Sequence, residues 1–545
     1  MGGHKAMAQY QQLAIEKFTE GMIDEDQLSR ISYPEGACVE CENVIFMPTG
    51  ALKKRKGYSK LNSTVWASGG YLTKIHSIDT TAGINYALAF SVSGTAGCAC
   101  IASIQVTGFG SDVASFVNVA CTGASAASAW APLITDAISV TNYAASAVMT
   151  YGGQDSVPPI WPANTASANL IEVTAMPSGA KHVCAWGNFL FLGNLFDNDG
   201  TTRKGSRIRW NTSSTIGTWP TAQWIDLDAD DGDEITAMGV YKNKLIVFKK
   251  YKMFVIHYVG GVLMFQEERI SSAIGCVGPN AFIDYGGTLY FIGVYTAYKW
   301  EGSGEPTTIS DKIQSQWDNI CVTLANIFEV ESDDINWQIW FNVANGADAT
   351  TKNIIYALDT RFKSWTRYNI TAHCLGGIDY GVTEAYLHKI LAYSSYSERI
   401  KDATSNKEGV LCLGGAGYLY KYGDDDSDDG AAIEGYWTSR WMDFGLPHSN
   451  KRLIRATAYV ERLVSDADYN LHVDLYTDWN PVTVNTQKTV SLSGDVSYPM
   501  MEKRMDFTKQ FRSAQIKIYT DGADEPFILH RLLIDWIGKG QTKVS

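Results

Sequence analysis

From Asn43 onward, the chain consists of short apolar or alternating runs separated by Gly, Asn, Asp and Pro. Alternation of apolar and polar residues with period two marks a strand with one buried face, and closely spaced turn residues are typical of antiparallel sheets. The pattern therefore predicts an all-β protein. The preceding segment QYQQLAIEKFTEGMIDEDQLSRI holds a helical candidate that Gly21 interrupts, so we expect residues 1–40 to form a partly irregular N-terminal arm.

Three segments repeat one pattern: an aromatic residue, a turn containing Asn or Gly, and a Leu-centred apolar strand. They are WGNFLFLGN, YKNKLIVFKKYKMFVI and YGGTLYFIGVYTAYKW, and their central residues Leu190, Leu245 and Leu289 stand 55 and 44 residues apart. A single hairpin cannot bury both of its faces, whereas radial stacking of such units does. The spacing favours four-stranded blades of a β-propeller over an ordinary antiparallel sandwich, which would also contain hairpins.

Residues 95–175 differ in composition, being rich in Ala, Ser and Thr and nearly free of Lys and Arg. The runs IASIQV, ASFVNVA and SAVMTYGG predict strands, and the stretch around Ala126 to Ile138 predicts an amphipathic helix. This order suggests a small α+β domain inserted into a larger β body. A long polar loop is the alternative, but structureless loops of that length are uncommon in compact domains.

A second change of pattern follows the acidic run GDDDSDDG, where clean period-two alternation continues for roughly 100 residues. We therefore expect the acidic run to be a solvated linker before a separate domain. The predicted fold class is all-β: a β-propeller body with an inserted small α+β domain and a C-terminal β-sandwich. The predicted boundaries are 1–40 for the N-terminal arm, 41–94 for the start of the propeller, 95–175 for the insertion, 176–423 for the remaining propeller, 424–432 for the linker and 433–545 for the sandwich.

The segment ENVIFMPTGALKKRKGY contains four consecutive cations, Lys53, Lys54, Arg55 and Lys56. The chain as a whole is acidic, with a net charge of −13 and a pI of about 5.2. A surface that grips nucleic acid needs clustered cations, and the overall balance argues against one. We expect a strand–turn–strand arm whose alternation places Lys53 and Arg55 on one face. At an interface between subunits, this arm could meet an acidic loop of a neighbour. The candidate loop contains Asp226, Asp228, Asp230, Asp231, Asp233 and Glu234.

That acidic loop, DLDADDGDE, resembles a calcium loop because closely spaced carboxylates suit hard cations. Its glycine stands at the seventh position rather than the sixth, and Ala237 stands where an EF-hand has a bidentate Glu. An acidic turn before a strand is the favoured interpretation. The close cysteine pairs Cys38/Cys41 and Cys98/Cys100 have no matching second CxxC, so we expect buried thiols rather than zinc. We predict no metal and no cofactor.

Catalytic motifs are absent from the sequence: there is no GxSxG, no HExxH and no Walker loop. Glycoside hydrolysis needs only two carboxylates at a suitable separation, and 58 acidic residues leave it open. We predict no enzyme and no catalytic residues. The sequence also has no pattern of a cleaved leader and no apolar run near the roughly 20 residues that span a bilayer. We therefore expect a chain that is made and folded in a cytosol, without a membrane span.

Four passages together resemble the tail nozzle, or packaged-DNA stabilisation, family of short-tailed bacteriophages, which includes tail tubular protein B. They are YPEGACVECENVIFMPTGALKKRKGY, RIRWNTSS with the following GTWPTAQWIDLDADDGDEITAMGVYKNKLIVFKKYKMFVI, CVGPNAFIDYGGTLYFIGVYTAYKWEG, and YWTSRWMDFGLPHSNKRLIRATAYVE. No single motif is specific, and the resemblance lies in their order along most of the chain outside the Ala/Ser-rich block.

The resemblance implies a structural virion protein that is assembled in the host cytoplasm. Its propeller would join a ring, a homohexamer, below the portal and adaptor rings, and would close the distal DNA channel until ejection. Tail fibres or spikes are further possible neighbours, and DNA would pass without specific binding, which an acidic surface favours.

Two rival functions stay open. The first is a virion-associated propeller that binds or degrades host surface glycan, which predicts a pocket with converging aromatic residues and two carboxylates. The second is a cellular propeller scaffold, which predicts a monomer.

Overall fold

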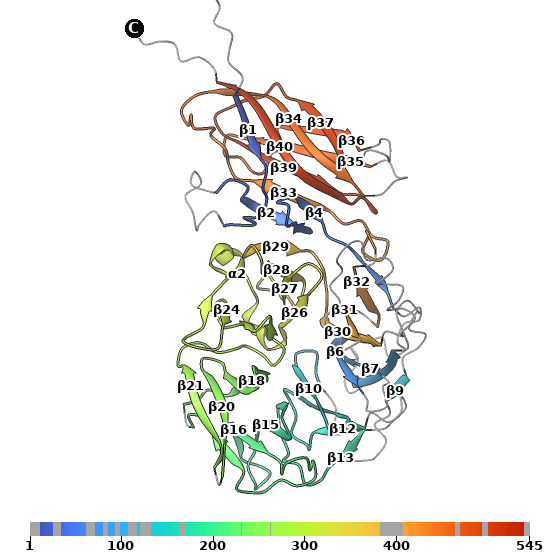
Figure 1. Cartoon of the computed structure of the whole chain (residues 1–545), viewed down its shortest axis with the longest axis vertical. Helices are drawn as coiled ribbons and strands as arrows, with labels where there is room; N and C mark the ends of the chain where they lie inside the picture. Colours follow the sequence, from blue (N-terminus) through green and yellow to red (C-terminus); the bar gives the residue numbers. More distant parts are fainter. Residues whose placement is uncertain are drawn as a thin grey trace, which may run out of the picture.

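In a computed structural model, the described residues are 11–24, 34–61, 71–79, 85–92, 99–106, 117–119, 132–162, 170–229, 231–261, 263–381, 407–415, 417–423, 425–463, 469–492 and 500–538. These residues are nearly all β: 54% of them lie in strands and 3% in helices. Figure 1 shows a sandwich at one end of the long axis and a ring of sheets at the other. The predicted all-β class and β-propeller are therefore confirmed.

Six separate four-stranded antiparallel sheets of the described chain belong to the ring. Five of them are built from consecutive strands, as the hairpin repeats predict. These five are β6–β9 (Tyr71–Asp79, Asn85–Val92, Ala99–Val106, Val117–Val119), β10–β13 (Ile138–Tyr143, Ser146–Tyr151, Pro159–Pro162, Ile171–Glu172), β14–β17 (His182–Trp186, Phe189–Phe196, Arg203–Trp210, Trp224–Asp226), β18–β21 (Ile235–Tyr241, Lys244–Lys249, Met253–Gly260, Met264–Ser271) and β22–β25 (Phe282–Tyr285, Thr288–Ile292, Ala297–Trp300, Thr307–Thr308).

The three predicted repeat units occupy equivalent places in three of these sheets. Leu190, Leu245 and Leu289 lie in the second strand of their sheets, and all three are buried. The turn before each of these strands contains residues with positive φ, including Gly187, Asn243 and Gly286, as tight hairpins require. The repeat of 44 to 55 residues in the sequence therefore corresponds to one blade, and the repeated segment is the hairpin between its first two strands.

The sixth four-stranded sheet closes the ring with a strand from the beginning of the chain. It consists of β30 (Cys374–Gly381), β31 (Lys407–Gly414), β32 (Leu419–Tyr422) and β5 (Tyr58–Lys60). Tyr58 pairs with Tyr422 in the antiparallel register of β5 and β32. The first strand of this sheet, β30, also contacts β6, the first strand of the next sheet along the ring. An N-terminal strand therefore fastens the last blade to the first.

A further four strands also belong to the ring, because the first of them, β26 (Glu329–Asp333), contacts both β22 and β30; the same strands link the ring to the sandwich. β26–β29 (Glu329–Asp333, Gln338–Val343, Ile354–Asp359, Ser364–Tyr368) pair in the same antiparallel order and belong to a nine-stranded sheet. The sheet continues through a parallel contact between Glu42 and Arg367. The Arg367 guanidinium donates to Glu42 and Glu40 at 2.7 and 2.6 Å and to the Tyr436 hydroxyl at 3.0 Å, so charge-assisted hydrogen bonds reinforce the junction.

The sandwich packs two sheets over one core. One sheet has the order β3-β4-β40-β34-β37, with β1 on β40 and β38 on β34; the other is the continuation β2-β33-β39-β35-β36. Leu453, Leu532, Val473 and Ile516, two from each sheet, are fully buried in the same cluster. The strands are β1 (Gln11–Ile15), β2 (Cys38–Glu42), β3 (Val44–Phe46), β4 (Leu52–Lys54), β33 (Gly435–Ser439), β34 (Lys451–Arg462), β35 (Asn470–Thr477), β36 (Thr486–Ser491), β37 (Met500–Asp506), β38 (Gln510–Phe511), β39 (Ala514–Thr520) and β40 (Phe527–Gly538).

Two expectations about the N-terminal region are wrong. Residues 11–15 form β1, not a helix, and pair with β40 from Gln11↔Trp536 to Ile15↔Leu532. Residues 38–54 belong to the sandwich rather than to the start of the propeller. The physical reason is that strand pairing with residues about 500 positions away overrides local helix propensity.

The Ala/Ser-rich block supplies strands to two propeller sheets in its described part. IASIQV lies in β8, SAVMTY forms β11, and β9 covers only Val117–Val119. The described strands of 95–175 therefore lie within blades and not in a separate inserted domain. Most of the helix expected around Ala126 to Ile138 lies outside the described residues, and Ile138 begins β10. The change in composition therefore reflects small side chains on blade strands and does not mark a domain boundary.

The approach of the N-terminal segment to β29 can be tested at Gly21. Its φ is +69°, and an added Cβ would lie 2.6 Å from Cβ of Ser364 and 2.9 Å from the backbone nitrogen of Trp365. Gly200 has a similar φ of +71° with nothing within 4 Å of an added Cβ. We expect Gly200→Ala to cost about 1–2 kcal/mol for the left-handed backbone alone, and Gly21→Ala to cost more. Thermal melting midpoints measure the difference, and equal midpoints for the two variants would contradict this packing.

Candidate functional site

The cationic run at 53–56 folds into the body of its own chain. β3 and β4 form the predicted hairpin, with Val44 paired to Lys54. Lys54 is 1% exposed, and its Nζ donates to Thr520 Oγ1 at 3.2 Å and to the carbonyl oxygens of Glu525 and Gly522 at 3.3 and 3.4 Å. Burial lowers the pKa of Lys54 to about 8, against the opposing effect of Glu525. A side chain so enclosed is not a phosphate ligand.

The neighbouring cations pair with the acidic run that precedes the C-terminal domain. Arg55, also 1% exposed, donates from Nη1 and Nη2 to the two carboxylate oxygens of Asp428 at 2.8 and 2.7 Å. Lys56 pairs with Asp426 at 2.6 Å and Lys60 with Asp429 at 2.5 Å. The acidic run is therefore an ion-pair clamp and not a freely solvated linker. A bidentate arginine–carboxylate contact fixes geometry as well as charge.

These contacts show that the predicted role at a subunit interface is wrong for Lys54 and Arg55. Lys54 and Arg55 have partners inside the chain and almost no exposed surface, so they are not available to a neighbouring subunit. Strand β4 ends at Lys54, so the expected alternation covers only Lys53 and Lys54. An intersubunit role stays a prediction for Lys53 and for Lys56, whose side chain is 36% exposed.

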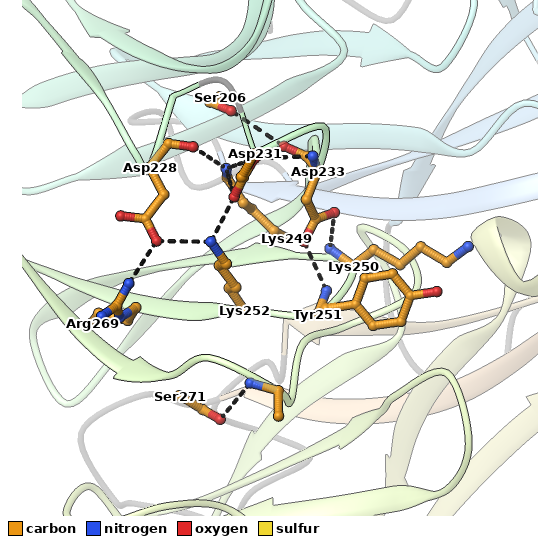
Figure 2. Close-up of polar contacts among 11 residues, drawn as sticks. Ser206, Asp228, Asp231, Asp233, Lys249, Lys250, Tyr251, Lys252, Arg269 and Ser271 are labelled. Atoms are coloured by element: carbon orange, nitrogen blue, oxygen red, sulfur yellow. Dashed lines mark hydrogen bonds and ion pairs between the residues drawn. The ribbon is translucent and has the colours of Figure 1, made fainter.

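The acidic turn at 226–234 is also neutralised within the chain. Figure 2 shows Asp228 and Asp231 facing Lys249, Lys252 and Arg269. Asp231 accepts from Lys249 at 2.9 Å and from Lys252 at 2.7 Å, and Asp228 accepts from Lys252 and Arg269, both at 2.9 Å. These ion pairs hold the turn against the hairpins of the blade that follows it, β18–β21.

The remaining acids of this turn have similar partners. The carboxylate of Asp226 accepts two hydrogen bonds from Arg207, and that of Asp233 accepts from the backbone nitrogens of Lys250 and Tyr251. Glu234 accepts from Asn194 at 2.8 Å. Asp230 lies outside the described residues. The structure thus provides the acidic turn that the sequence favoured over a calcium loop.

Metal sites formed by three or more His, Cys, Asp or Glu residues do not occur among the described residues. Cys38 and Cys41 are free and fully buried, and burial raises the pKa of the Cys38 thiol. Cys98 lies outside the described residues. No helix in the described part of the chain is long and apolar enough to cross a membrane.

Sequence reasoning missed a pocket at the first strands of several sheets of the ring, which we call the axial pocket. Its lining comes from five sheets and includes Thr73 of β6, Ile138 of β10, Asn280 before β22, Glu329 of β26 and His373 before β30. Asp136, Thr350, Thr351 and Lys352 complete its polar lining. The first strands of most successive sheets contact one another around the ring, and this arrangement brings these residues together. No local motif in the sequence marks them.

The chemistry of the axial pocket is dominated by a buried ion pair. Glu329 and Lys352, with side chains 3% and 4% exposed, lie 2.9 Å apart, and the same Glu329 oxygen, Oε2, accepts from the Leu375 backbone nitrogen at 2.8 Å. Burial, with a contribution from the Lys352 ammonium, lowers the pKa of His373. The volume open to the centre of a water molecule is about 20 Å³, which suits a water-sized occupant.

Comparison with known proteins shows no matching family model and no matching curated protein. Solved structures with some similarity include the extracellular domain of a one-component system from B. thetaiotaomicron, with 9% identity and TM-score 0.35 over 70% of this chain and 41% of that chain. The Neurospora crassa Pan2 WD40 domain has 7% identity and TM-score 0.37 over 68% and 97%.

A Penicillium chrysogenum α-L-arabinanase complexed with arabinobiose has 10% identity and TM-score 0.35 over 57% of this chain and 99% of that chain. The chain spans less than half the length of the B. thetaiotaomicron domain. At such identities and TM-scores, these similarities do not bear on activity. The propeller assignment rests on the sheet order within this chain.

The clamp between the cationic run and the acidic run predicts unequal effects of two substitutions. Arg55→Met leaves Asp428 without its buried partner, and we expect a loss of about 3 kcal/mol of unfolding free energy. Lys56→Met removes a partly exposed pair, which is worth about 0–1 kcal/mol. Urea denaturation followed by tryptophan fluorescence measures both. A loss for Arg55→Met no larger than that for Lys56→Met would show that the clamp does not stabilise the fold.

Proposed function

We propose that this chain is a structural subunit of a short-tailed phage tail, a nozzle that forms and closes the distal DNA channel. The observation that carries the proposal is the internal neutralisation of the cationic run. Lys54, Arg55 and Lys56 are all bound to partners in their own chain, while the net charge is −13. A wall that lets DNA pass should not neutralise phosphates, because each contact adds affinity through counterion release.

The described features of the axial pocket favour this structural role over glycan cleavage. The space open to the centre of a water molecule is only about 20 Å³, little more than one bound water needs, and this is too little for a sugar ring. No Trp, Tyr or Phe belongs to the described lining. One oxygen of Glu329 is already held by Lys352 and the Leu375 backbone, so that carboxylate acts as a structural group.

A second candidate function is the binding or degradation of host surface glycan by a virion-associated propeller. The observation that favours it is that two carboxylates, Asp136 and Glu329, line the same pocket, as a glycosidase requires. Movement of the loops at the mouth of the pocket would be needed to admit a sugar.

Ring formation in the proposed nozzle requires partners. The expected ones are further copies of the same chain in a six-fold ring, together with the adaptor and portal rings. A closed ring needs heterologous interfaces, so two different surfaces of one copy must be complementary. Within the 53–56 run, such a contact would involve Lys53, or Lys56 after exchange of its ion pair with Asp426.

Electron microscopy of the purified chain with portal and adaptor tests the proposal. We expect closed rings docked on the distal side of the adaptor, and native mass spectrometry should give a ring-sized assembly. A chain that stays monomeric and never joins the portal–adaptor complex would contradict the nozzle.

Glycan cleavage is tested separately by incubating the chain with host polysaccharide. The nozzle proposal expects no cleavage. Cleavage that is lost in Asp136→Asn but kept in Asp284→Asn, an exposed acid on β22, would establish the second candidate instead.

A further inference from the structure

The axial pocket contains a buried charge that the chain satisfies only on one side. Glu329 is 2% exposed, and its Oε1 atom is buried without a hydrogen-bond partner, while Oε2 has two. An unsatisfied buried acceptor is costly, and a charged one more so. The arrangement therefore calls for an occupant that carries a positive charge or a hydrogen-bond donor.

The titratable groups among the described lining residues sum, with their ordinary charges, to a net charge near −1. They are the carboxylates of Asp136 and Glu329, the Lys352 ammonium and the His373 imidazole. Because its pKa is lowered, His373 is neutral at pH 7. One monovalent cation would bring the total to zero. A divalent cation would leave an excess positive charge close to Lys352, which is unfavourable at low effective dielectric.

The lining also offers the right kind of atoms for a hard cation. Besides the two carboxylates, the lining includes Thr350, Thr351 and Asn280, whose side chains carry oxygen atoms, and hard cations take oxygen ligands. Groups of three or more His, Cys, Asp or Glu are absent from the described residues, which disfavours a transition metal. The volume of about 20 Å³ fits one small ion and excludes a bulky organic cation.

We propose that the axial pocket binds a single monovalent cation, Na⁺ or K⁺, between Glu329 Oε1 and the Asp136 carboxylate. Glu329 begins β26, and Asp136 precedes β10, so the ion joins blades that lie far apart in the sequence. The bound cation acts as a structural ion at the axis of the ring and stabilises its closure. This inference does not depend on the proposed tail function.

Thermal unfolding in different salts tests the proposal with the full chain. The melting midpoint is measured in 150 mM NaCl, KCl and tetramethylammonium chloride, so that ionic strength and screening are equal. We expect a midpoint higher by about 1–3 °C in NaCl or KCl, because a ligand that binds only the folded state stabilises it by mass action.

Two variants separate the axial site from general salt effects. Asp136→Asn keeps an oxygen that can accept from the Leu133 backbone nitrogen, as Asp136 does at 2.8 Å, but it removes the charge. We expect this variant to lose most of the difference between the salts. Asp284→Asn removes the same charge from an exposed position on β22 and should keep the difference. Circular dichroism confirms that both variants are folded.

A direct measurement is the anomalous scattering of crystals soaked in thallium(I), a heavy monovalent substitute for K⁺. We expect an anomalous peak within coordination distance of Glu329 Oε1, and its loss in Asp136→Asn. Equal melting midpoints in the three salts, or a pocket without a thallium peak, would overturn the proposal and leave a water molecule as the occupant.

Discussion

The structure depends on the pairing of the first 60 residues with strands from the end of the chain. β1 and β4 both pair with β40, β2 pairs with β33 and β29, and β5 pairs with β32. Without β5 the last blade would lack its fourth strand, and without β2 the sandwich sheet would lose its link to β26–β29. These contacts close loops of several hundred residues, whose entropic cost rises only slowly with length. A modest number of long-range pairings can therefore hold both parts together.

Buried charges fix the register of this closure. Arg55 meets Asp428, Lys54 reaches the β39–β40 turn, and Arg367 joins the two carboxylates of β2 to Tyr436. Apolar contacts alone would tolerate small shifts between neighbouring strands, whereas a buried ion pair is strongly unfavourable when its partner is displaced. The buried pair Lys54 and Arg55 thus specifies the alignment of N-terminal and C-terminal segments within the chain.

The local sequence pattern predicted most of the strands and hairpins, but it did not predict which distant strands pair with one another. The hairpin units around Leu190, Leu245 and Leu289 were predictable, because a turn followed by a buried strand leaves a short-range signal. The partner of β1 was not predictable, because nothing near Gln11–Ile15 indicates pairing with residues 532–536. The axial pocket was not predictable for the same reason, because Asp136, Glu329 and His373 are far apart in the sequence and come together only when the ring forms. The charges at 53–56 were visible, but their burial depends on Asp428, more than 370 residues away.

The order of pairing has a consequence for synthesis. β1 and β4 leave the ribosome first, yet β40 comes last, after nearly the whole chain has been translated. At elongation rates of about 5–20 residues per second, this delay is on the order of a minute. During that time the edge strands of the nascent sandwich are unpaired, and exposed strand edges of this kind promote aggregation. The blades between them can form in sequence as they emerge, so folding proceeds from the middle of the chain outward, and the sandwich is completed only once β40 has emerged.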